Sequence, residues 1–218
     1  MTDAPRVRAD ALRLVAVTDS LHDGVDGLAR RAAAAVAGGA TMLTLRLPGE
    51  PPRMLAAAAR ALHAAAPGVP LLVSDRVDVA LAVDAEGVHL GSSDLSPAAV
   101  RRFAPEGLII GVSVGSSEEV ERVAGADFVA IGPVHAASPG TANAAAGERA
   151  VLGVEGFRRL VAACGLPAVA VGGVSAANVG ALMDAGANGV AVISALLGAV
   201  DPARVARALR AALDASER

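Results

Sequence analysis

Residues 168–195, AVAVGGVSAANVGALMDAGANGVAVISA, contain two short valine-rich runs on either side of an amphipathic stretch. The runs at 168–171 and 189–193 are almost entirely apolar, which is typical of parallel strands whose two faces are both covered by helices. The stretch at 175–185 has the polarity pattern of a helix, and Gly186 provides a C-cap that leads back into a strand. The segment therefore predicts one β–α–β unit with a parallel pair of strands.

The same alternation occurs along the whole chain. Strands are expected at 14–18, 41–46, 70–74, 87–90, 108–112, 128–132, 168–171 and 189–193. Helical stretches are expected near 23–37, 50–65, 76–83, 96–103, 116–124, 154–164, 175–185 and 202–214. Eight such units in 218 residues predict an α/β fold, a single (β/α)8 TIM barrel, rather than an open sheet. No linker or shift of composition divides the chain, so one domain over residues 1–218 is expected.

Composition excludes several classes of function. The chain has 19 arginines and no lysine, tyrosine or tryptophan, which excludes Schiff-base and P-loop lysine chemistry and removes stacking platforms for nucleic acid. The net charge of -3, with both signs scattered, argues against nucleic acid or a membrane surface as a partner. The first residues show no hydrophobic run behind basic residues, so no signal peptide is expected. We therefore expect a cytoplasmic protein, with a two-fold homodimer as the default assembly.

Polar residues gather at one end of the expected strands. Active sites of TIM barrels lie at the C-terminal ends of the strands, where side chains from different strands meet. The residues at these ends are Thr18, Asp19, Arg46, Ser74, Asp75, His89, Asp94, Ser113, His135, Gly172, Gly173 and Ser194. The opposite turns, such as 37–40 and 124–127, are instead glycine caps that end helices. This asymmetry predicts one active site on a single rim.

A phosphate site is expected where the seventh and eighth strands end. Gly172 and Gly173 follow the seventh strand, and Ser194 opens a helix after the eighth. Glycines let backbone amides approach an anion closely, and a helix N-terminus favours negative charge. Loops after these two strands are a common phosphate site in TIM barrels. The alternative is a tight strand-to-helix turn that requires glycine for its backbone alone.

Asp75 and Asp94 are candidate ligands of Mg²⁺. Asp75 ends the third expected strand and Asp94 lies shortly after the fourth, so adjacent strands bring the two carboxylates to one edge of the rim. Hard oxygen ligands without nearby thiols suit Mg²⁺, which takes substrate phosphate oxygens as further ligands. The alternative is that each aspartate caps the helix that follows it.

Other residues of this rim could bind or transfer protons. Arg46 could hold a phosphate as a bidentate fork, or point to solvent. His89 lies within a strand, where a structural buried histidine is the alternative to a binding role. His135 stands at the mouth of a connection at 136–151, where a general acid or base would be reachable. A connection of this length without periodicity is expected to act as a lid.

Six motifs resemble the thiamine phosphate synthase family, which also includes the related thiazole tautomerases. They are Ser74-Asp75-Arg76-Val77-Asp78, Gly87-Val88-His89-Leu90-Gly91, Ile110-Gly111-Val112-Ser113, Ile131-Gly132-Pro133-Val134, Val171-Gly172-Gly173-Val174 and Gly189-Val190-Ala191-Val192-Ile193-Ser194. The motifs stand in family order, and the resemblance runs from about Leu14 to Leu213.

This resemblance implies a transferase of thiamine biosynthesis that joins a pyrimidine alcohol diphosphate to a thiazole phosphate and releases pyrophosphate. It implies Mg²⁺ on the positions of Asp75 and Asp94, and pyrophosphate contacts from those of Arg46 and Ser113. It implies that the Gly172-Gly173 loop and the turn at Ser194 hold the thiazole phosphate. Further substrate-binding positions are Thr44, Ser74, His89, Ser138, Thr141 and Ile193.

The chain departs from the family pattern in the half that would bind pyrophosphate. Thr44 stands where the family usually has an amide, Ser74 where it has asparagine, and no lysine follows Arg46 or Val134. Two lost cationic contacts, worth about 1.5–3 kcal/mol each, imply a weaker grip on pyrophosphate. Ser138 and Thr141 would offset part of this loss.

Two other functions stay open at this point. A thiazole tautomerase would use a histidine after the sixth strand, and His135 stands two residues beyond the family position, on the same side if the strand continues. It would need neither metal nor pyrophosphate. A paralogue that binds a thiamine precursor without chemistry is the third alternative.

Overall fold

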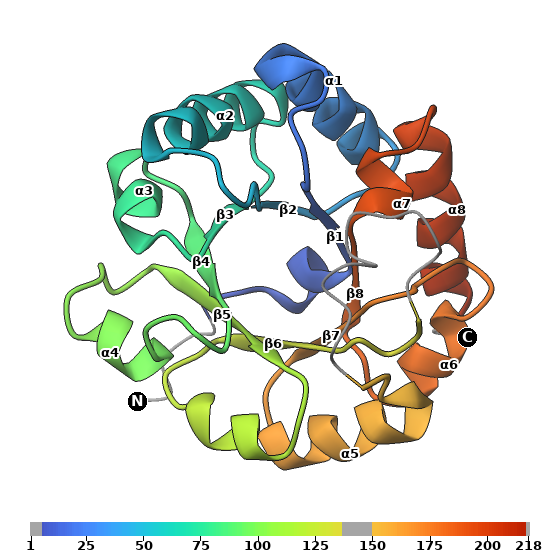
Figure 1. Cartoon of the computed structure of the whole chain (residues 1–218). Helices are drawn as coiled ribbons and strands as arrows, with labels where there is room; N and C mark the ends of the chain where they lie inside the picture. The colour runs from blue at the N-terminus through green and yellow to red at the C-terminus, as the bar shows by residue number, and fades with distance from the viewer. Residues whose placement is uncertain (1–5, 137–149, 217–218) are drawn as a thin grey trace.

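The computed structural model describes residues 6–136 and 150–216, and eight parallel strands close into a ring within them (Figure 1). The strands are β1 (Leu14–Val17), β2 (Met42–Leu45), β3 (Leu71–Ser74), β4 (Gly87–Leu90), β5 (Ile109–Val114), β6 (Phe128–Ile131), β7 (Ala168–Val171) and β8 (Gly189–Val192). Neighbours pair in sequence order, and β8 closes the ring against β1 with Val15 opposite Ala191. The predicted (β/α)8 barrel is confirmed.

Helices surround this ring. They are α1 (Gly24–Ala37), α2 (Pro52–Ala65), α3 (Val77–Ala82), α4 (Pro97–Arg101), α5 (Gly153–Cys164), α6 (Val179–Asp184), α7 (Ser194–Leu197) and α8 (Pro202–Ala215), with the 3-10 helix η2 (Glu118–Arg122). A second 3-10 helix, η1 (Ala9–Leu12), precedes β1 and does not belong to this outer layer. Proline opens α2, α4 and α8, where its missing N–H costs no helical hydrogen bond. Ser96 and Asp201 cap two of these helices through their side chains.

Several boundaries differ from the sequence prediction by a few residues; α6, for example, spans Val179–Asp184 rather than 175–185. The helix expected at 116–124 is wrong, because only the short 3-10 helix η2 forms there. Val120 and Val123 pack partly buried against the core, but none of the η2 residues is fully buried, so the segment has little apolar burial to stabilise a longer helix. Strand β5 runs two residues further than expected, because Ser113 and Val114 still pair with β6. Ser113 therefore lies inside a strand rather than just beyond one.

Alternation along the strands separates two cores. Residues such as Leu14, Leu43 and Val73 point outward and pack with the helices in one continuous cluster. Their neighbours point into the barrel, where the lower layers contain Leu12, Val15, Met42, Leu72, Ile109, Phe128 and Val169. The helix η1 supplies Leu12 and lies inside the ring of strands in Figure 1. The barrel is thus filled with apolar side chains at one end and leaves space only toward the C-terminal ends of its strands.

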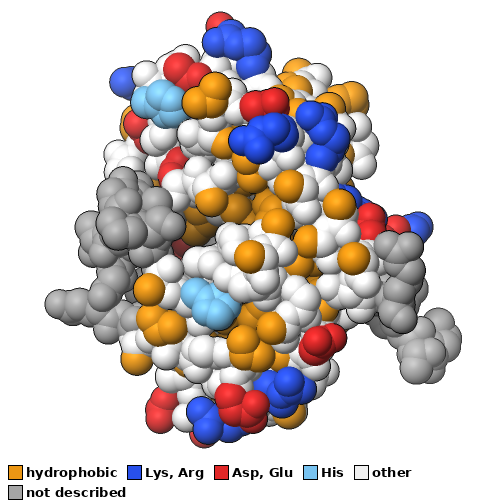
Figure 2. All heavy atoms as spheres, turned by 90° about the vertical axis from the view of Figure 1, so that its right-hand side faces the viewer, with side chains coloured by type: hydrophobic (Ala, Val, Ile, Leu, Met, Phe, Trp, Pro, Cys, Tyr) orange, Lys and Arg blue, Asp and Glu red, His pale blue; other side chains and the backbone are white. Residues whose placement is uncertain are grey.

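Figure 2 faces the side of the barrel covered by α6, α7 and α8, where basic and acidic side chains lie next to one another at the surface.

In the described part of the chain, no helix combines the length and the apolar character that crossing a bilayer requires. The connection predicted as a lid, 136–151, falls almost entirely outside the described residues.

Candidate active site

A cavity of about 950 Å³ opens at the C-terminal ends of the strands. Every predicted site residue that the structure describes lines it: Thr44, Arg46, Ser74, Asp75, His89, Asp94, Ser113, His135, Gly172, Gly173, Ile193 and Ser194. Ser138 and Thr141 lie outside the described residues. The structure therefore brings the predicted rim residues together around one cavity, while their roles as a site stay predictions.

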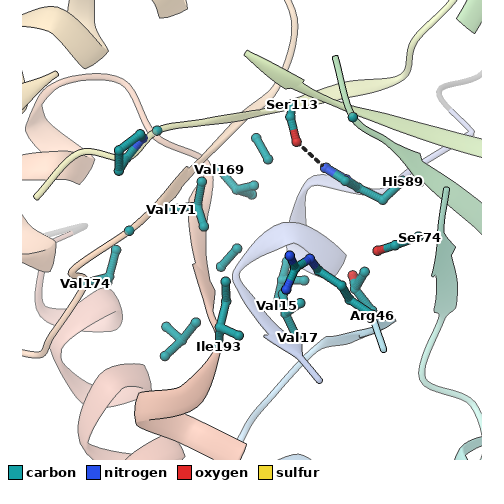
Figure 3. Close-up of a pocket in the computed structure, with 18 of the residues that line it drawn as sticks. Val15, Val17, Arg46, Ser74, His89, Ser113, Val169, Val171, Val174 and Ile193 are labelled. Carbon is teal, nitrogen blue, oxygen red and sulfur yellow. Dashed lines mark hydrogen bonds between the residues drawn. The ribbon is translucent and has the colours of Figure 1, made fainter. Parts of the chain in front are cut away.

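The cavity has a polar half and an apolar half. Figure 3 shows Arg46, Ser74, His89 and Ser113 on one side and Val169, Val171, Val174 and Ile193 on the other. These polar side chains come from β2 to β5: Ser74 is the last residue of β3, and the other three lie one residue before or after the end of their strand. Such a division suits a ligand that carries anionic groups at one end and a flat apolar ring in its middle.

Asp75 and Asp94 meet at the polar edge of this cavity. Asp75 has a left-handed backbone with φ of 67°, and its amide donates to the His89 carbonyl at 2.9 Å. Asp94 Oδ2 accepts a hydrogen bond from the Gly91 amide at 2.6 Å. Neither aspartate caps a helix, because Arg76 stands at the N-cap of α3 and Ser96 at that of α4. The alternative reading of the pair as helix caps is wrong.

The two carboxyl groups disturb each other electrostatically. Although Asp75 is exposed at the rim, loss of hydration against neighbouring protein atoms, together with the hydrogen bond and charge of Asp94, raises the pKa of Asp75 to about 6. The positive charge of Arg46 opposes this shift. An acidic pair in which one carboxyl group is harder to ionise is a pair that a divalent cation would stabilise in its charged form.

The side chains at this edge supply only part of the ligands that a magnesium ion needs. Among the described residues, no three histidine, cysteine or acidic side chains lie close enough together to form a complete metal cage. Mg²⁺ is commonly held by one or two carboxylates, with water and phosphate oxygens as its remaining ligands. Asp75 and Asp94 therefore fit a cation that is completed by a phosphorylated substrate.

His89 and Ser113 form a hydrogen-bonded pair deeper in the cavity. His89 Nε2 lies 2.9 Å from Ser113 Oγ (Figure 3). Burial lowers the pKa of His89 to about 4, so its imidazole is neutral at pH 7. The ring is tilted against Phe128, and a Cβ on Gly111 would lie 2.8 Å from His89 Nδ1. His89 is thus held in one place by packing and can hydrogen-bond the Ser113 hydroxyl without carrying charge.

Arg46 is positioned through its backbone. Thr18 is fully buried, and its hydroxyl accepts from the Arg46 amide at 2.8 Å and donates to the Arg46 carbonyl at 3.0 Å. The Arg46 side chain extends into the cavity (Figure 3). The structure therefore agrees with the prediction that this guanidinium faces the site rather than bulk solvent.

The double glycine after β7 has a packing cause as well as a binding interpretation. Gly172 and Gly173 have φ of 94° and 60°, in the region that L side chains rarely adopt. A Cβ on Gly172 would lie 2.7 Å from Pro133 Cβ, and one on Gly173 would lie 2.6 Å from His135 Cβ. The backbones are joined, because the His135 amide donates to the Gly172 carbonyl at 3.1 Å. The glycines thus bring two loops together beside the cavity, and α7 begins nearby at Ser194.

His135 reaches the cavity from the loop after β6. Its Nε2 is buried and has no hydrogen-bond partner within the residues that the structure describes. A buried ring nitrogen without a partner is costly and is most readily satisfied by a ligand. The predicted reach of His135 toward substrate is therefore consistent with its position.

Sequence reasoning missed the apolar wall and the groups that hold the site in place. Val15, Val17, Phe128, Val169 and Val171 line the cavity but read as ordinary strand residues. Their inward direction could have been found from the two-residue period that also places Ser74 and His89 inside. The Gly91 amide acts within a turn, and the Thr18 hydroxyl contacts the end of the neighbouring strand, so no local pattern signals either contact.

Comparisons with known proteins agree on one family. A family model described as thiamine monophosphate synthase matches residues 14–196. A thiamine-phosphate synthase of Azorhizobium caulinodans is 45% identical over 95% of this chain and 97% of its own, and one of Xanthobacter autotrophicus is 44% identical over 93% and 95%. The solved structure of a thiamine phosphate pyrophosphorylase from Pyrococcus furiosus has a TM-score of 0.83 at 34% identity, covering 95% of this chain and 98% of that one.

Proposed function

Because the chain belongs to the thiamine monophosphate synthase family, we propose that it is a transferase that joins a pyrimidine alcohol diphosphate to a thiazole phosphate. The bond from the pyrimidine methylene carbon to the diphosphate oxygen breaks, and its electron pair leaves with pyrophosphate. The thiazole nitrogen then donates its lone pair to that carbon, which gives thiamine phosphate. The observation that carries the proposal is the division of one cavity into an Asp75–Asp94–Arg46 edge and an apolar wall.

The polar edge matches the departing diphosphate. Arg46 offers a guanidinium fork that can bind two phosphate oxygens, and the Ser113 hydroxyl, hydrogen-bonded to neutral His89, can donate to a third. Preorganised donors of this kind stabilise negative charge as it develops on the leaving group. Thr44 and Ser74, which are both buried, place hydroxyl groups beside the same edge.

Asp75 and Asp94 would hold Mg²⁺ at this edge. When bound, the ion supplies charge neutralisation for the diphosphate as it leaves. The Gly91 amide orients the carboxylate of Asp94 by a hydrogen bond, and the left-handed backbone of Asp75 orients the carboxylate of Asp75 toward the same position.

The loop at Gly172–Gly173 and the turn at Ser194 would bind the phosphate of the thiazole through backbone amides. The apolar wall formed by Val15, Val169 and Ile193 would pack against the two rings and exclude water from the carbocation. Exclusion of water matters because water would otherwise compete with the thiazole nitrogen for the carbon.

A weakened pyrophosphate half is part of the proposal. Arg46 is the cation that the described edge offers at this position, and the chain has no lysine to add a second. Loss of two charge-assisted contacts corresponds to about 3–6 kcal/mol of ground-state binding if nothing replaces them. We therefore expect a high KM for the diphosphate substrate together with a strong requirement for the cation. A cytoplasmic location and a two-fold homodimer remain part of the same proposal.

A thiazole tautomerase is the second candidate, favoured by the unpartnered Nε2 of His135. Two variants, each assayed for both reactions, distinguish the synthase from the tautomerase. Asp94→Asn abolishes pyrophosphate release if the protein is the synthase and leaves isomerisation of a thiazole carboxylate phosphate intact if it is the tautomerase. His135→Asn has the reverse pattern. Saturable binding of either substrate with no turnover by the unmodified protein would support a non-catalytic paralogue instead.

A further inference from the structure

Arg122 reaches across from η2 to the turn that carries Asp94. Its Nη1 donates to the Ser92 carbonyl, and its Nη2 donates to the Asp94 carbonyl at 3.1 Å. Arg122 is half-buried behind this turn and does not line the cavity. One guanidinium therefore binds both carbonyl groups that flank Ser93.

The turn that Arg122 binds, residues 91–94, lies between β4 and α4. It contains no helix or strand, and within it the Asp94 amide donates to the Gly91 carbonyl at a long 3.3 Å. A second hydrogen bond runs from the Gly91 amide to Asp94 Oδ2 at 2.6 Å. It joins the carboxylate to the turn, so any movement of the turn moves the carboxylate as well. The Asp94 carboxylate is thus tied to a turn that Arg122 binds from outside.

We infer that Arg122 is a positioning residue that holds the Asp94 carboxylate ready for a divalent cation. The inference rests on the proposed cation site at Asp75 and Asp94. It follows from the planar fork of arginine, which can bind two carbonyl oxygens at once in a fixed geometry, whereas lysine offers a single flexible point charge. Groups that orient a metal ligand typically contribute about 10–100-fold to metal affinity.

The clamp also links two consecutive strand ends. Ser113 lies on β5, the strand that leads into η2, and Asp94 follows β4. Arg122 therefore ties the turn that carries the acidic pair to the segment that follows the His89–Ser113 pair. Loosening this tie is expected to move the carboxylate while leaving the barrel intact.

The test compares Arg122→Gln and Arg122→Lys with a control, Arg60→Gln, on the exposed face of α2. Mn²⁺ binding to the protein without substrate is titrated by electron paramagnetic resonance, and Mg²⁺ binding by competition. We expect the dissociation constant for Mn²⁺ to rise by about 10-fold or more in Arg122→Gln and by less in Arg122→Lys. Arg60→Gln should bind like the unmodified protein.

Two further readouts separate positioning from folding. Hydrogen exchange of the amides in residues 90–96 should accelerate in Arg122→Gln, and the maximal rate at saturating Mg²⁺ should stay within about 2-fold of normal because no reacting group is lost. Arg122→Lys keeps the aliphatic stem and serves if the glutamine variant does not fold.

The outcomes distinguish this inference from the proposal beneath it. If the unmodified protein binds Mn²⁺, Asp94→Asn abolishes that binding, and Arg122→Gln binds as tightly as the unmodified protein, Arg122 is merely structural and the inference fails alone. If the unmodified protein binds no divalent cation, with or without the diphosphate substrate, the carboxylate site is wrong and the inference falls with it.

Discussion

Replacing Gly173 with alanine tests the close approach between the loops after β6 and β7. Gly173 has φ of 60°, and an added Cβ would lie 2.6 Å from both His135 Cβ and the Ala136 carbonyl oxygen. The left-handed backbone costs a non-glycine residue about 1–2 kcal/mol. Overpacking against another backbone adds about 1–3 kcal/mol. The free energy of unfolding should therefore fall by about 2–5 kcal/mol, a loss of about 5–15 °C in Tm for a protein of this size.

Gly165 provides a matched control. It has φ of 62° at the end of α5, and an added Cβ would meet nothing within 4 Å. Gly165→Ala should therefore carry the backbone cost alone, about 1–2 kcal/mol. Since the chain has no tryptophan or tyrosine, urea unfolding is best followed by circular dichroism at the helical band. Equal losses of stability in the two variants would refute the packing argument, whatever their effect on phosphate binding.

Three further predictions concern the polar half of the cavity. The pKa of His89 is about 4 in the folded protein, against an ordinary value of 6.5. Between these two pH values the unfolded chain binds more protons than the folded one. The free energy of unfolding therefore falls by up to about 3 kcal/mol as the pH drops from 6.5 to 4. The difference in urea stability between the unmodified protein and His89→Asn should shrink by that amount over the window; a pH-independent difference would contradict it. Because the pKa of Asp75 is about 6, protons compete with the cation for this carboxylate below that pH. The dissociation constant for Mg²⁺ should rise by about tenfold per pH unit well below pH 6. Calorimetric titration that finds the same affinity at pH 5 and pH 7 would contradict this prediction. Thr18→Val removes both hydrogen bonds to the Arg46 backbone and should lower the free energy of unfolding by about 1–3 kcal/mol. It should also raise KM for the diphosphate substrate more than it lowers kcat. A variant with unchanged KM would show that this contact does not position Arg46.

The barrel could be predicted because its signals are local. Each strand is a short apolar run, and glycines such as Gly39 and Gly186, with φ of 110° and 99°, mark where helices end. The polar rim could be predicted for the same reason, since Arg46 and Asp75 directly follow apolar strands. The acidic pair needed only one further step, because adjacent parallel strands end at the same edge.

The rest of the site depends on contacts between segments that are far apart in the chain. Whether Ser113 ends a strand or lies within one is decided by its pairing with Ala130 on β6. That Gly173 faces His135, or that Thr18 holds Arg46, follows from the closure of the ring and from no pattern near either residue. The segment at 116–124 has a polar sequence with the period of a helix, yet it forms only the 3-10 helix η2, in which no residue is fully buried.

The most direct test of the account is a single assay of the unmodified protein with a pyrimidine alcohol diphosphate and a thiazole phosphate, in which pyrophosphate and thiamine phosphate are measured together. We predict equal amounts of the two products in the presence of Mg²⁺ and a loss of both when the ion is chelated. Turnover that persists at full rate without a divalent cation, or no product at any concentration of both substrates with Mg²⁺ present, would contradict the claim that the acidic edge of this cavity drives the departure of pyrophosphate.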